Sequence, residues 1–190
     1  MVEALMIVAH PDDETIWAGG LIERKKNWHW TIASMCRASD PDRKPKFEKV
    51  CREYGAKSFI ADLEDETLEE IDISTAEKLL SPLEQKKFDF IFTHGENGEY
   101  GHIRHKDTHR AVVSAVRKKK LDCRKLFVFA YEKNGIGIVP GKEATKKIGL
   151  DEKELERKKN IVEKEYGYAR DSPDVQYCTK TEAFKEVIVK

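Results

Sequence analysis

Short runs of apolar residues recur along the first two thirds of the chain. Each run is four to seven residues long and rich in β-branched or aromatic side chains. Continuous apolar runs of this length are typical of strands that are buried on both faces of a sheet. The pattern therefore predicts five strands, at Leu5–Ala9, Trp30–Cys36, Lys57–Leu63, Phe88–Thr93 and Leu126–Tyr131.

Between these runs, apolar residues repeat at helical spacing. The repeats predict helices at Thr15–Lys26, Phe47–Tyr54, Ala76–Leu83 and Ala111–Val116. Pro82 predicts a kink or a break in the third helix. Strands that alternate with helices indicate a parallel sheet with helices on both faces. We therefore expect an α/β fold, a Rossmann-like three-layer sandwich with a mainly parallel sheet of about five strands.

After Tyr131 the pattern loosens. Glycines and a proline mark an irregular segment, and Asp151–Tyr168 is rich in Lys and Glu with helical spacing. A chain of 190 residues suits one domain and is short for two. We expect a single domain over residues 1–190, with its core at residues 4–131. Residues 132–190 are expected to form an irregular segment and a C-terminal helix that packs on the core.

Composition narrows the function classes. Hydrophobic residues make up 39% of the chain and charged residues 37%, and 35 basic side chains balance 35 acidic ones. A nucleic-acid binder needs a surplus of cations, so no nucleic-acid partner is expected. No run approaches the ~20 apolar residues of a membrane span, and a cytoplasmic protein is the default. The four cysteines are scattered without a C-x-x-C pair, which favours plain thiols.

A histidine and three acidic residues follow the first predicted strand, in the sequence His10-Pro11-Asp12-Asp13-Glu14. Proline and acidic residues suit the first turn of a helix, so Asp12 or Asp13 could serve merely as a helix cap. Capping accounts for one aspartate. It does not account for a histidine and three acids within five residues.

A second cluster, His102-x-x-His105, follows the fourth predicted strand. In a doubly wound sheet the first and fourth strands are usually neighbours, and ligands bind where the strand order reverses. The two clusters should then meet at one edge of the sheet. Imidazoles and a carboxylate are ordinary ligands for Zn²⁺, and three ligands with an open position define a catalytic site. We therefore predict a metal site.

The two clusters resemble the signatures of a known family. Ala9-His10-Pro11-Asp12-Asp13-Glu14, with Gly19-Gly20 further on, resembles the A-H-P-D-D-E motif of LmbE-like, PIG-L-type deacetylases. Gly101-His102-Ile103-Arg104-His105 resembles their G-H-x-x-H motif. The resemblance extends over residues 5–131. It implies a zinc-dependent hydrolase that removes an N-acetyl group from an N-acetylglucosamine-like sugar or sugar conjugate.

The resemblance also implies roles for single residues. His10, Asp13 and His105 would bind one Zn²⁺ per chain, and Asp12 would be the general base. Tyr100 would donate a hydrogen bond to the carbonyl oxygen. His102 would be cationic, and would stabilise the intermediate or help to protonate the leaving amine.

Three arginines are candidates for substrate binding. Arg37 and Arg43 lie near a position where many members of the family carry an Arg-x-x-Glu motif, although the glutamate is absent here. Arg104 replaces an aspartate between the motif histidines. We expect it to place a cation near the pocket mouth, where it would favour an anionic substrate.

Two other classes remain open, a Rossmann-like nucleotide-binding protein and a metal-dependent phosphoesterase. A dinucleotide site would require a G-x-G-x-x-G loop after the first strand, where the His-Pro-Asp-Asp-Glu segment stands instead. A phosphoesterase often holds two metals with more carboxylates. A homo-oligomer is left open as well.

Overall fold

Seven strands form the central sheet in the computed structural model, which describes residues 1–67, 69–84, 86–135 and 137–188. The strand order is β3-β2-β1-β4-β5-β9-β8. The first five strands are parallel, as expected, and β9 and β8 extend the sheet in antiparallel fashion beyond β5. Their bounds are Glu3–Val8 (β1), His29–Ser34 (β2), Lys57–Ile60 (β3), Lys87–Thr93 (β4), Asp122–Phe129 (β5), Lys146–Gly149 (β8) and Thr181–Val187 (β9).

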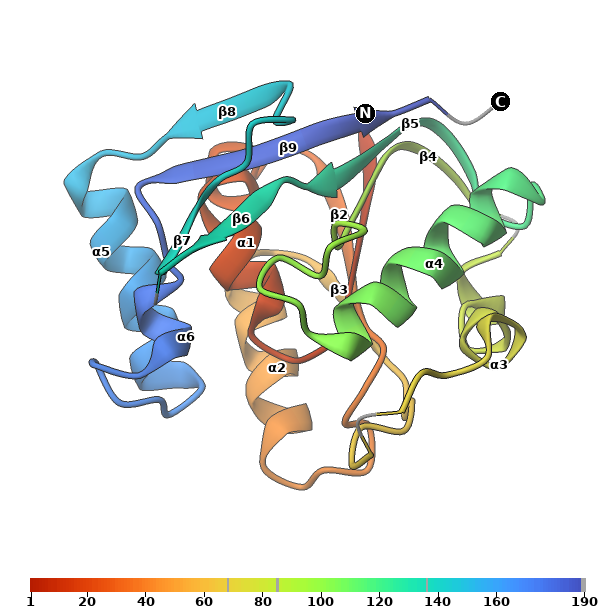
Figure 1. Cartoon of the computed structure of the whole chain (residues 1–190), viewed down its shortest axis with the longest axis horizontal. Helices are drawn as coiled ribbons and strands as arrows, with labels where there is room; N and C mark the ends of the chain where they lie inside the picture. The colour runs from red at the N-terminus through yellow and green to blue at the C-terminus, as the bar shows by residue number, and fades with distance from the viewer. Residues whose placement is uncertain (68, 85, 136, 189–190) are drawn as a thin grey trace.

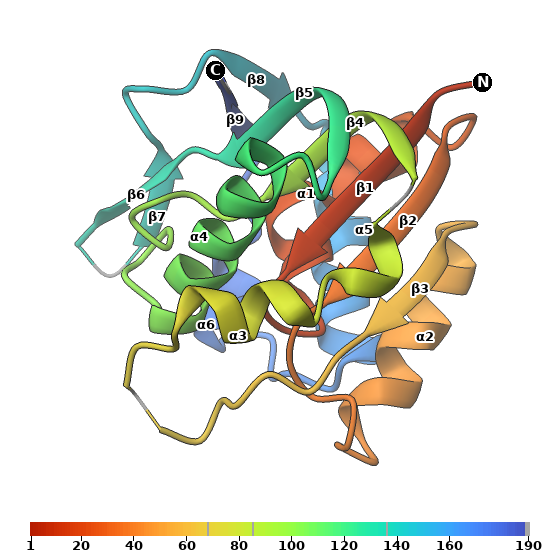
Figure 2. The same cartoon turned by 90° about the vertical axis from the view of Figure 1, so that its right-hand side faces the viewer.

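Helices cover both faces of the sheet, which confirms the three-layer sandwich (Figures 1 and 2). On one face lie α1 (Asp13–Arg24), α2 (Arg43–Glu53), α5 (Glu152–Asn160) with a π-helical extension (Ile161–Glu165), and α6 (Pro173–Gln176). On the other face lie α3 (Ile73–Lys78), a 3₁₀ turn (Ser81–Leu83) and α4 (Ile103–Arg117). Pro82 lies in that turn, so the predicted break is present.

Strand β1 explains why its sequence is apolar throughout. Ala4, Met6 and Val8 pack into the core under α1 and α2, whereas Leu5 and Ile7 pack into the core under α3 and α4. A strand with helices on both sides has no face for polar residues. Its burial fixes the point from which the His10 segment emerges.

The strand order reverses between β1 and β4, as the sequence predicted. These two strands pair in parallel, with Ile7 opposite Thr93. The chain segments that follow the carboxyl ends of β1 and β4 therefore diverge and leave a crevice between them. Open α/β sheets bind ligands in such a crevice.

The described residues between 132 and 188 contain more regular structure than expected. They form a β6–β7 hairpin (Tyr131–Asn134 and Gly137–Pro140), two strands of the main sheet and two helices. Ala183 and Phe184 of β9 are buried, so the core does not end at residue 131. Charged residues in β9 do not alternate regularly with apolar ones, and this irregular pattern concealed the strand. Its Glu182 is buried and pairs with Lys158.

That buried carboxylate also shapes α1. The helix is interrupted at Ala18, which has φ −147° and ψ 17°. Glu182 accepts the backbone N–H groups of Gly20 and Leu21 at 2.7 and 2.8 Å, so it caps the second half of the helix. A Cβ at Gly20 would lie 2.3 Å from Leu150 Cδ2, so any other residue here would require the Leu150 side chain to move.

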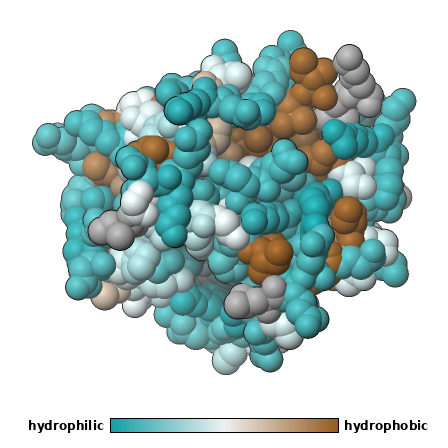
Figure 3. Space-filling view, in the orientation of Figure 1, coloured by the Kyte–Doolittle hydropathy of each residue, from teal (hydrophilic) through white to brown (hydrophobic). Residues whose placement is uncertain are grey.

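The side of the molecule seen in Figures 1 and 3, where the helices of both layers are visible, is mainly hydrophilic. A hydrophobic patch lies above α4, where Val128, Val187 and Ile188 line a groove. No helix in the described part of the chain is long and apolar enough to cross a bilayer.

Candidate metal centre and active site

A pocket of about 410 Å³ opens beside the carboxyl ends of β1 and β4. It brings together most of the side chains that the sequence singled out, along with several from the C-terminal segment. Its lining consists of His10, Pro11, Asp12, Asp13, Ile16, Trp17, Arg37, Asp40, Arg43, Asp65, Tyr100, His102, Tyr168, Asp174 and Tyr177.

Asp13 lies at the centre of a histidine cluster below this pocket. Its Oδ2 atom is 3.2 Å from His10 Nδ1 and accepts the backbone N–H of His10 at 2.9 Å. Its Oδ1 atom accepts the indole N–H of Trp17, one turn along α1, at 2.8 Å. The carboxylate is therefore held in one orientation from both sides.

His105, in the first turn of α4, faces the same carboxylate. Its Nδ1 atom is 2.6 Å from Glu99 Oε2, and its Nε2 atom is 3.4 Å from Asp13 Oδ2. Nε2 is buried and makes no hydrogen bond to any described residue. The ring centroids of His10 and His105 are 5.4 Å apart, so the two motifs meet as predicted.

Two further imidazoles border the cluster; both ring nitrogens of His94 have partners, and Nδ1 of His102 has one. His94 Nε2 accepts the backbone N–H of Ala9 at 2.9 Å, and its Nδ1 atom is 2.8 Å from Glu99. His102 Nδ1 accepts the N–H of Arg104 at 3.3 Å and so caps α4.

These contacts suit a metal ion. Donor atoms of His10, His102 and His105 lie within 4.8 Å of one another, as do those of Asp13, His94 and His105. His105 belongs to both groups, and its buried Nε2 atom has no hydrogen-bond partner among the residues that the structure describes. Two imidazoles and a carboxylate are an ordinary donor set for Zn²⁺. A carboxylate on the far nitrogen of a ligand histidine, as Glu99 is on His105, is the usual support for such a site.

The electrostatics of the cluster favour ionised carboxylates. Burial opposes the charge on Glu99, but the nearby imidazoles of His94 and His105 outweigh it and lower its pKa to about 2. Burial likewise opposes the charge on Asp13, and His105, His94 and His10 together hold its pKa well below the usual range. Both groups are therefore carboxylates at neutral pH.

Asp12 occupies the N-cap position of α1, but its side chain makes no capping hydrogen bond, so the simple capping interpretation is wrong. Its Oδ2 atom instead accepts the hydroxyl of Tyr168 at 2.5 Å and lies 3.6 Å from Arg43 Nη1. Burial, together with the charge of Asp13, raises its pKa well above the ordinary value. A carboxylate with a raised proton affinity in a pocket is suited to accepting a proton.

Tyr100 and His102 lie on the opposite wall. Burial, and then the charge of Asp13, raises the pKa of Tyr100, so its hydroxyl remains a hydrogen-bond donor. Burial and the neighbouring His105 and His10 lower the pKa of His102 to about 4. A pKa of about 4 favours the neutral imidazole at pH 7, and the Nδ1 contact then leaves the proton on Nε2.

The structure separates the three arginines. Arg37 and Arg43 line the pocket. Arg104 is fully buried outside it, where its guanidinium group donates to Glu64, Thr67, Glu69 and Asp107. The expected cation at the pocket mouth is therefore absent at this position, because Arg104 fastens the loop that follows β3 to α4.

Three contributors were not foreseen in these roles. Asp65, in the loop after β3, is 3.1 Å from His10 Nε2 and accepts Arg37 Nη2 at 2.6 Å. Glu99 lies next to the second motif, and this position in the sequence was the one feature that could have assigned Glu99 to the site. Tyr168 ends the Lys- and Glu-rich segment that was expected only to form a helix on the core, and no sequence pattern connected it with Asp12.

Solved structures with the same fold span nearly the whole chain. A conserved protein from Thermus thermophilus aligns with TM-score 0.72 and 18% identity, covering 100% of this chain and 96% of its own. The hydratase GalB from Pseudomonas putida, which acts on 4-carboxy-2-hydroxymuconate, aligns with TM-score 0.69 and 13% identity, over 100% and 98%. The N,N'-diacetylchitobiose deacetylase from Pyrococcus horikoshii aligns with TM-score 0.72 and 14% identity, over 97% and 83%. At these identities the likeness shows a shared fold, and a fold does not determine a reaction.

Sequence comparison is more specific. No curated protein matches the chain significantly. Residues 5–116, which contain both histidine motifs, match the family described as GlcNAc-PI de-N-acetylase (PIG-L). Because this match covers more than half of the sequence, the chain belongs to the GlcNAc-PI de-N-acetylase family.

Proposed function

We propose that the protein is a zinc-dependent N-deacetylase that hydrolyses the acetamido group of an N-acetylglucosamine-like sugar or sugar conjugate. The observation that carries this proposal is the buried, unpartnered Nε2 atom of His105, which faces Asp13 beneath a pocket lined by Asp12. Family membership supports the reaction type.

His10, Asp13 and His105 would hold one ion. A bound zinc ion supplies Lewis acidity, which polarises an amide carbonyl and lowers the pKa of a water molecule. The protein supplies the orientation of the ligands, because Glu99 holds His105, Trp17 holds Asp13, and Asp65 contacts His10.

Asp12 would accept the proton of the attacking water. It is not among the proposed ligands, and Tyr168 and Arg43 hold its Oδ2 atom at the pocket wall. The proton that it gains is then available for the leaving amine, which must be protonated to depart. General-base assistance of this kind is typically worth about 10²–10⁴-fold in rate.

Tyr100 and His102 would stabilise the negative charge that develops on the carbonyl oxygen. Each retains a proton at neutral pH, on the phenol oxygen and on Nε2 respectively. Donors that are already aimed at the position of charge need no reorganisation during the reaction.

The decisive experiment measures amine release from N-acetylglucosamine and N,N'-diacetylchitobiose by zinc-loaded protein, with metal content determined on the same sample. We expect turnover that a chelator abolishes and zinc restores. Asp12→Asn should retain its zinc and its Tm, yet lose about 10²–10⁴-fold in kcat. Near-normal turnover by this zinc-loaded variant would end the assignment of the base.

The same preparation tests the two alternative classes. Hydrolysis of p-nitrophenyl phosphate without amine release would favour a phosphoesterase. Tight binding of a dinucleotide by metal-free protein would favour a nucleotide-binding protein.

A further inference from the structure

We infer that the pocket is built for an uncharged, hydroxyl-rich sugar that Asp174 and Tyr177 recognise, and that it disfavours sugars with a phosphate or another anionic group. The inference rests on the proposed deacetylase function and names the substrate class of that same site.

Each cation of the pocket lies against an acidic side chain, although Arg43 Nη1 makes no hydrogen bond to any described residue. Arg37 Nη2 donates to Asp65 Oδ2 at 2.6 Å. The guanidinium group of Arg43 lies over the ring of Tyr168, 4.6 Å from its centroid, with Nη1 3.6 Å from Asp12. No other lysine or arginine lines the pocket in the part of the chain that the structure describes. A phosphate-binding pocket needs a cation that is not yet neutralised, usually one with several donors aimed at the ligand.

Carboxylates outnumber these cations. Five line the pocket, against two guanidinium groups. An anionic substituent would therefore bring like charges together in a partly desolvated space, where they are poorly screened. The one further arginine that the sequence offered, Arg104, is buried elsewhere.

Asp174 differs from the other carboxylates of the pocket. Asp40 accepts backbone N–H groups at the start of α2, and Asp65 contacts His10 and Arg37. The Asp174 carboxylate has no hydrogen bond or ion pair to any described residue, and it faces the pocket. A carboxylate of this kind accepts hydrogen bonds from hydroxyl groups, and its two oxygens can take a neighbouring pair.

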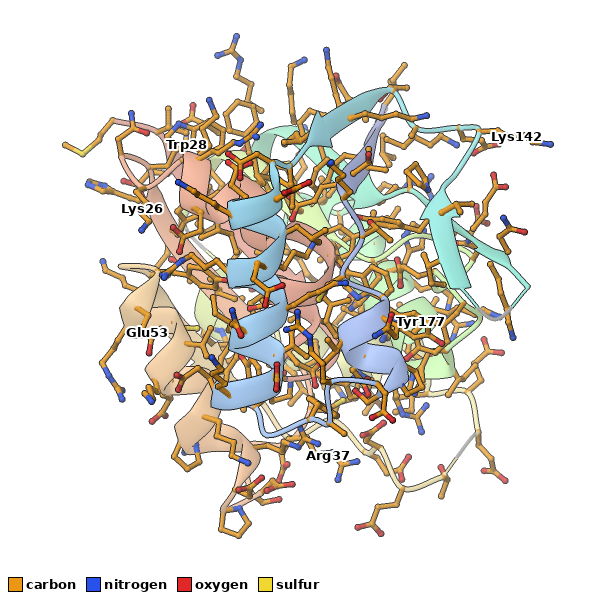
Figure 4. All side chains as sticks on the ribbon, turned by 90° about the vertical axis from the view of Figure 1, so that its left-hand side faces the viewer. Lys26, Trp28, Arg37, Glu53, Lys142 and Tyr177 are labelled. Atoms are coloured by element: carbon orange, nitrogen blue, oxygen red, sulfur yellow. The ribbon has the colours of Figure 1, made fainter. Side chains whose placement is uncertain are left out.

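Tyr177 provides an apolar wall next to this acceptor. Its half-buried ring stacks on Trp17 at a centroid distance of 6.1 Å and lies 5.0 Å from Tyr100. Figure 4 shows Tyr177 beside α6, on the same face of the molecule as Arg37. A flat aromatic surface beside a carboxylate suits a sugar ring, which has C–H groups on its faces and hydroxyls at its edge.

The first test compares turnover of methyl N-acetylglucosaminide with that of N-acetylglucosamine 1-phosphate by zinc-loaded protein. We expect kcat/KM to be at least about tenfold higher for the neutral sugar, with the gap narrowing at high salt. Equal or faster turnover of the phosphorylated sugar would overturn the inference and leave the deacetylase function intact.

The second test addresses the named residues. Asp174→Asn and Tyr177→Ala should each raise KM for the neutral sugar roughly tenfold and leave kcat within about twofold. Asp174→Asn should also reduce the difference in kcat/KM between the neutral sugar and the phosphorylated sugar. The matched control is Asp171→Asn, an exposed aspartate of the same segment outside the pocket, which should change neither value. Unchanged KM in both pocket variants would refute the assignment.

A third test does not depend on catalysis. Methyl glucoside and glucose 1-phosphate carry no N-acyl group, so calorimetry with zinc-loaded wild-type protein reports binding alone. Tighter binding of the neutral sugar supports the inference even if no acetyl group is released, in which case only the proposed function fails. Tighter binding of the phosphate overturns the inference.

Discussion

Asp12 has a backbone φ of 119°, in the region that side chains other than glycine rarely adopt. Aspartate and asparagine tolerate positive φ better than most residues, and strained backbone of this kind is concentrated at functional sites. Asn is therefore the substitution that separates chemistry from folding here, because Ala would add backbone strain to the loss of the carboxylate.

Tyr168 makes the closest side-chain contact with that carboxylate, and we expect Tyr168→Phe to lower kcat about 5- to 50-fold with KM, zinc content and Tm nearly unchanged. The phenyl ring remains under Arg43, so only the hydrogen bond to Asp12 is lost. Steady-state kinetics and metal analysis provide the measurement. Loss of zinc in this variant would contradict a role through Asp12.

The matched control is Tyr166→Phe. The hydroxyl of Tyr166 donates to Glu14 at 2.7 Å, and both side chains are buried. This variant should lower Tm and spare kcat. The effect of Tyr168→Phe on kcat should also disappear in an Asp12→Asn background, because residues that act as one unit are not additive.

Metal affinity should depend on Glu99 as well as on the ligands. His105→Ala removes a proposed ligand and should abolish stoichiometric zinc binding. Glu99→Gln leaves the ligands in place but weakens the support of His105, and should cost about 10–100-fold in affinity. Titration with a chromophoric zinc chelator measures both, with His29→Ala, an exposed histidine, as control. Full affinity in Glu99→Gln would show that His105 is oriented by other contacts.

At the scale of elements, one carboxylate joins α3 to the end of α4. Glu77 is buried in α3, and its oxygens accept Lys118 and Lys120 Nζ at 2.8 and 3.1 Å. The Lys118 hydrogen bond, with those of Ser114 and Lys120, lowers its pKa from 4.5 to about 2. A lowered pKa means that the unfolded chain binds this proton more readily, so the contribution to stability is present above pH 4.5 and is lost as the pH falls through 2.

Glu77→Gln should therefore destabilise the protein by roughly 1–3 kcal/mol at pH 7, and by progressively less as the pH falls below 4.5. Urea unfolding of both proteins at several pH values measures the difference. A difference that stays constant down to pH 2.5 would show that the ion pair is not its source.

The elements that sequence patterning located well are those whose environment is uniform. β1 is buried on both faces and α4 carries a regular apolar stripe, so both were evident from periodicity. β9 was missed because its burial depends on a partner 24 residues away, Lys158, which neutralises Glu182. A pattern read along the chain does not record such long-range compensation.

For the whole molecule, the C-terminal segment should be indispensable. A chain that ends after Tyr131 retains both histidine motifs but loses β9, the antiparallel partner of β5, and the cap that Glu182 gives to α1. We expect this variant to lack a cooperative thermal transition by circular dichroism and to bind zinc weakly. A sharp transition near the wild-type Tm would show that residues 4–131 fold on their own.

Only some of the residues of the site could be predicted from the sequence. His10, Asp13 and His105 converge because β1 and β4 are adjacent, and strand order is predictable from the alternation of elements. Asp65 and Tyr168 reach the site from loops, whose paths depend on tertiary packing rather than on local pattern. The prediction that Arg104 lies near the pocket mouth was wrong for the same reason, since its partners lie in the loop after β3.

The contact between Glu182 and α1 has a consequence for the timing of assembly in the cell. The proposed ligands lie in the first 105 residues, whereas Glu182, which caps the interrupted helix, and Tyr168, which holds Asp12, are synthesised after them. A nascent chain on the ribosome thus exposes a histidine–aspartate cluster well before the pocket exists. If the proposed function is correct, substrate recognition requires β9 to have emerged and inserted beside β5. A translation product interrupted before β9 would then carry the proposed metal ligands without a complete pocket.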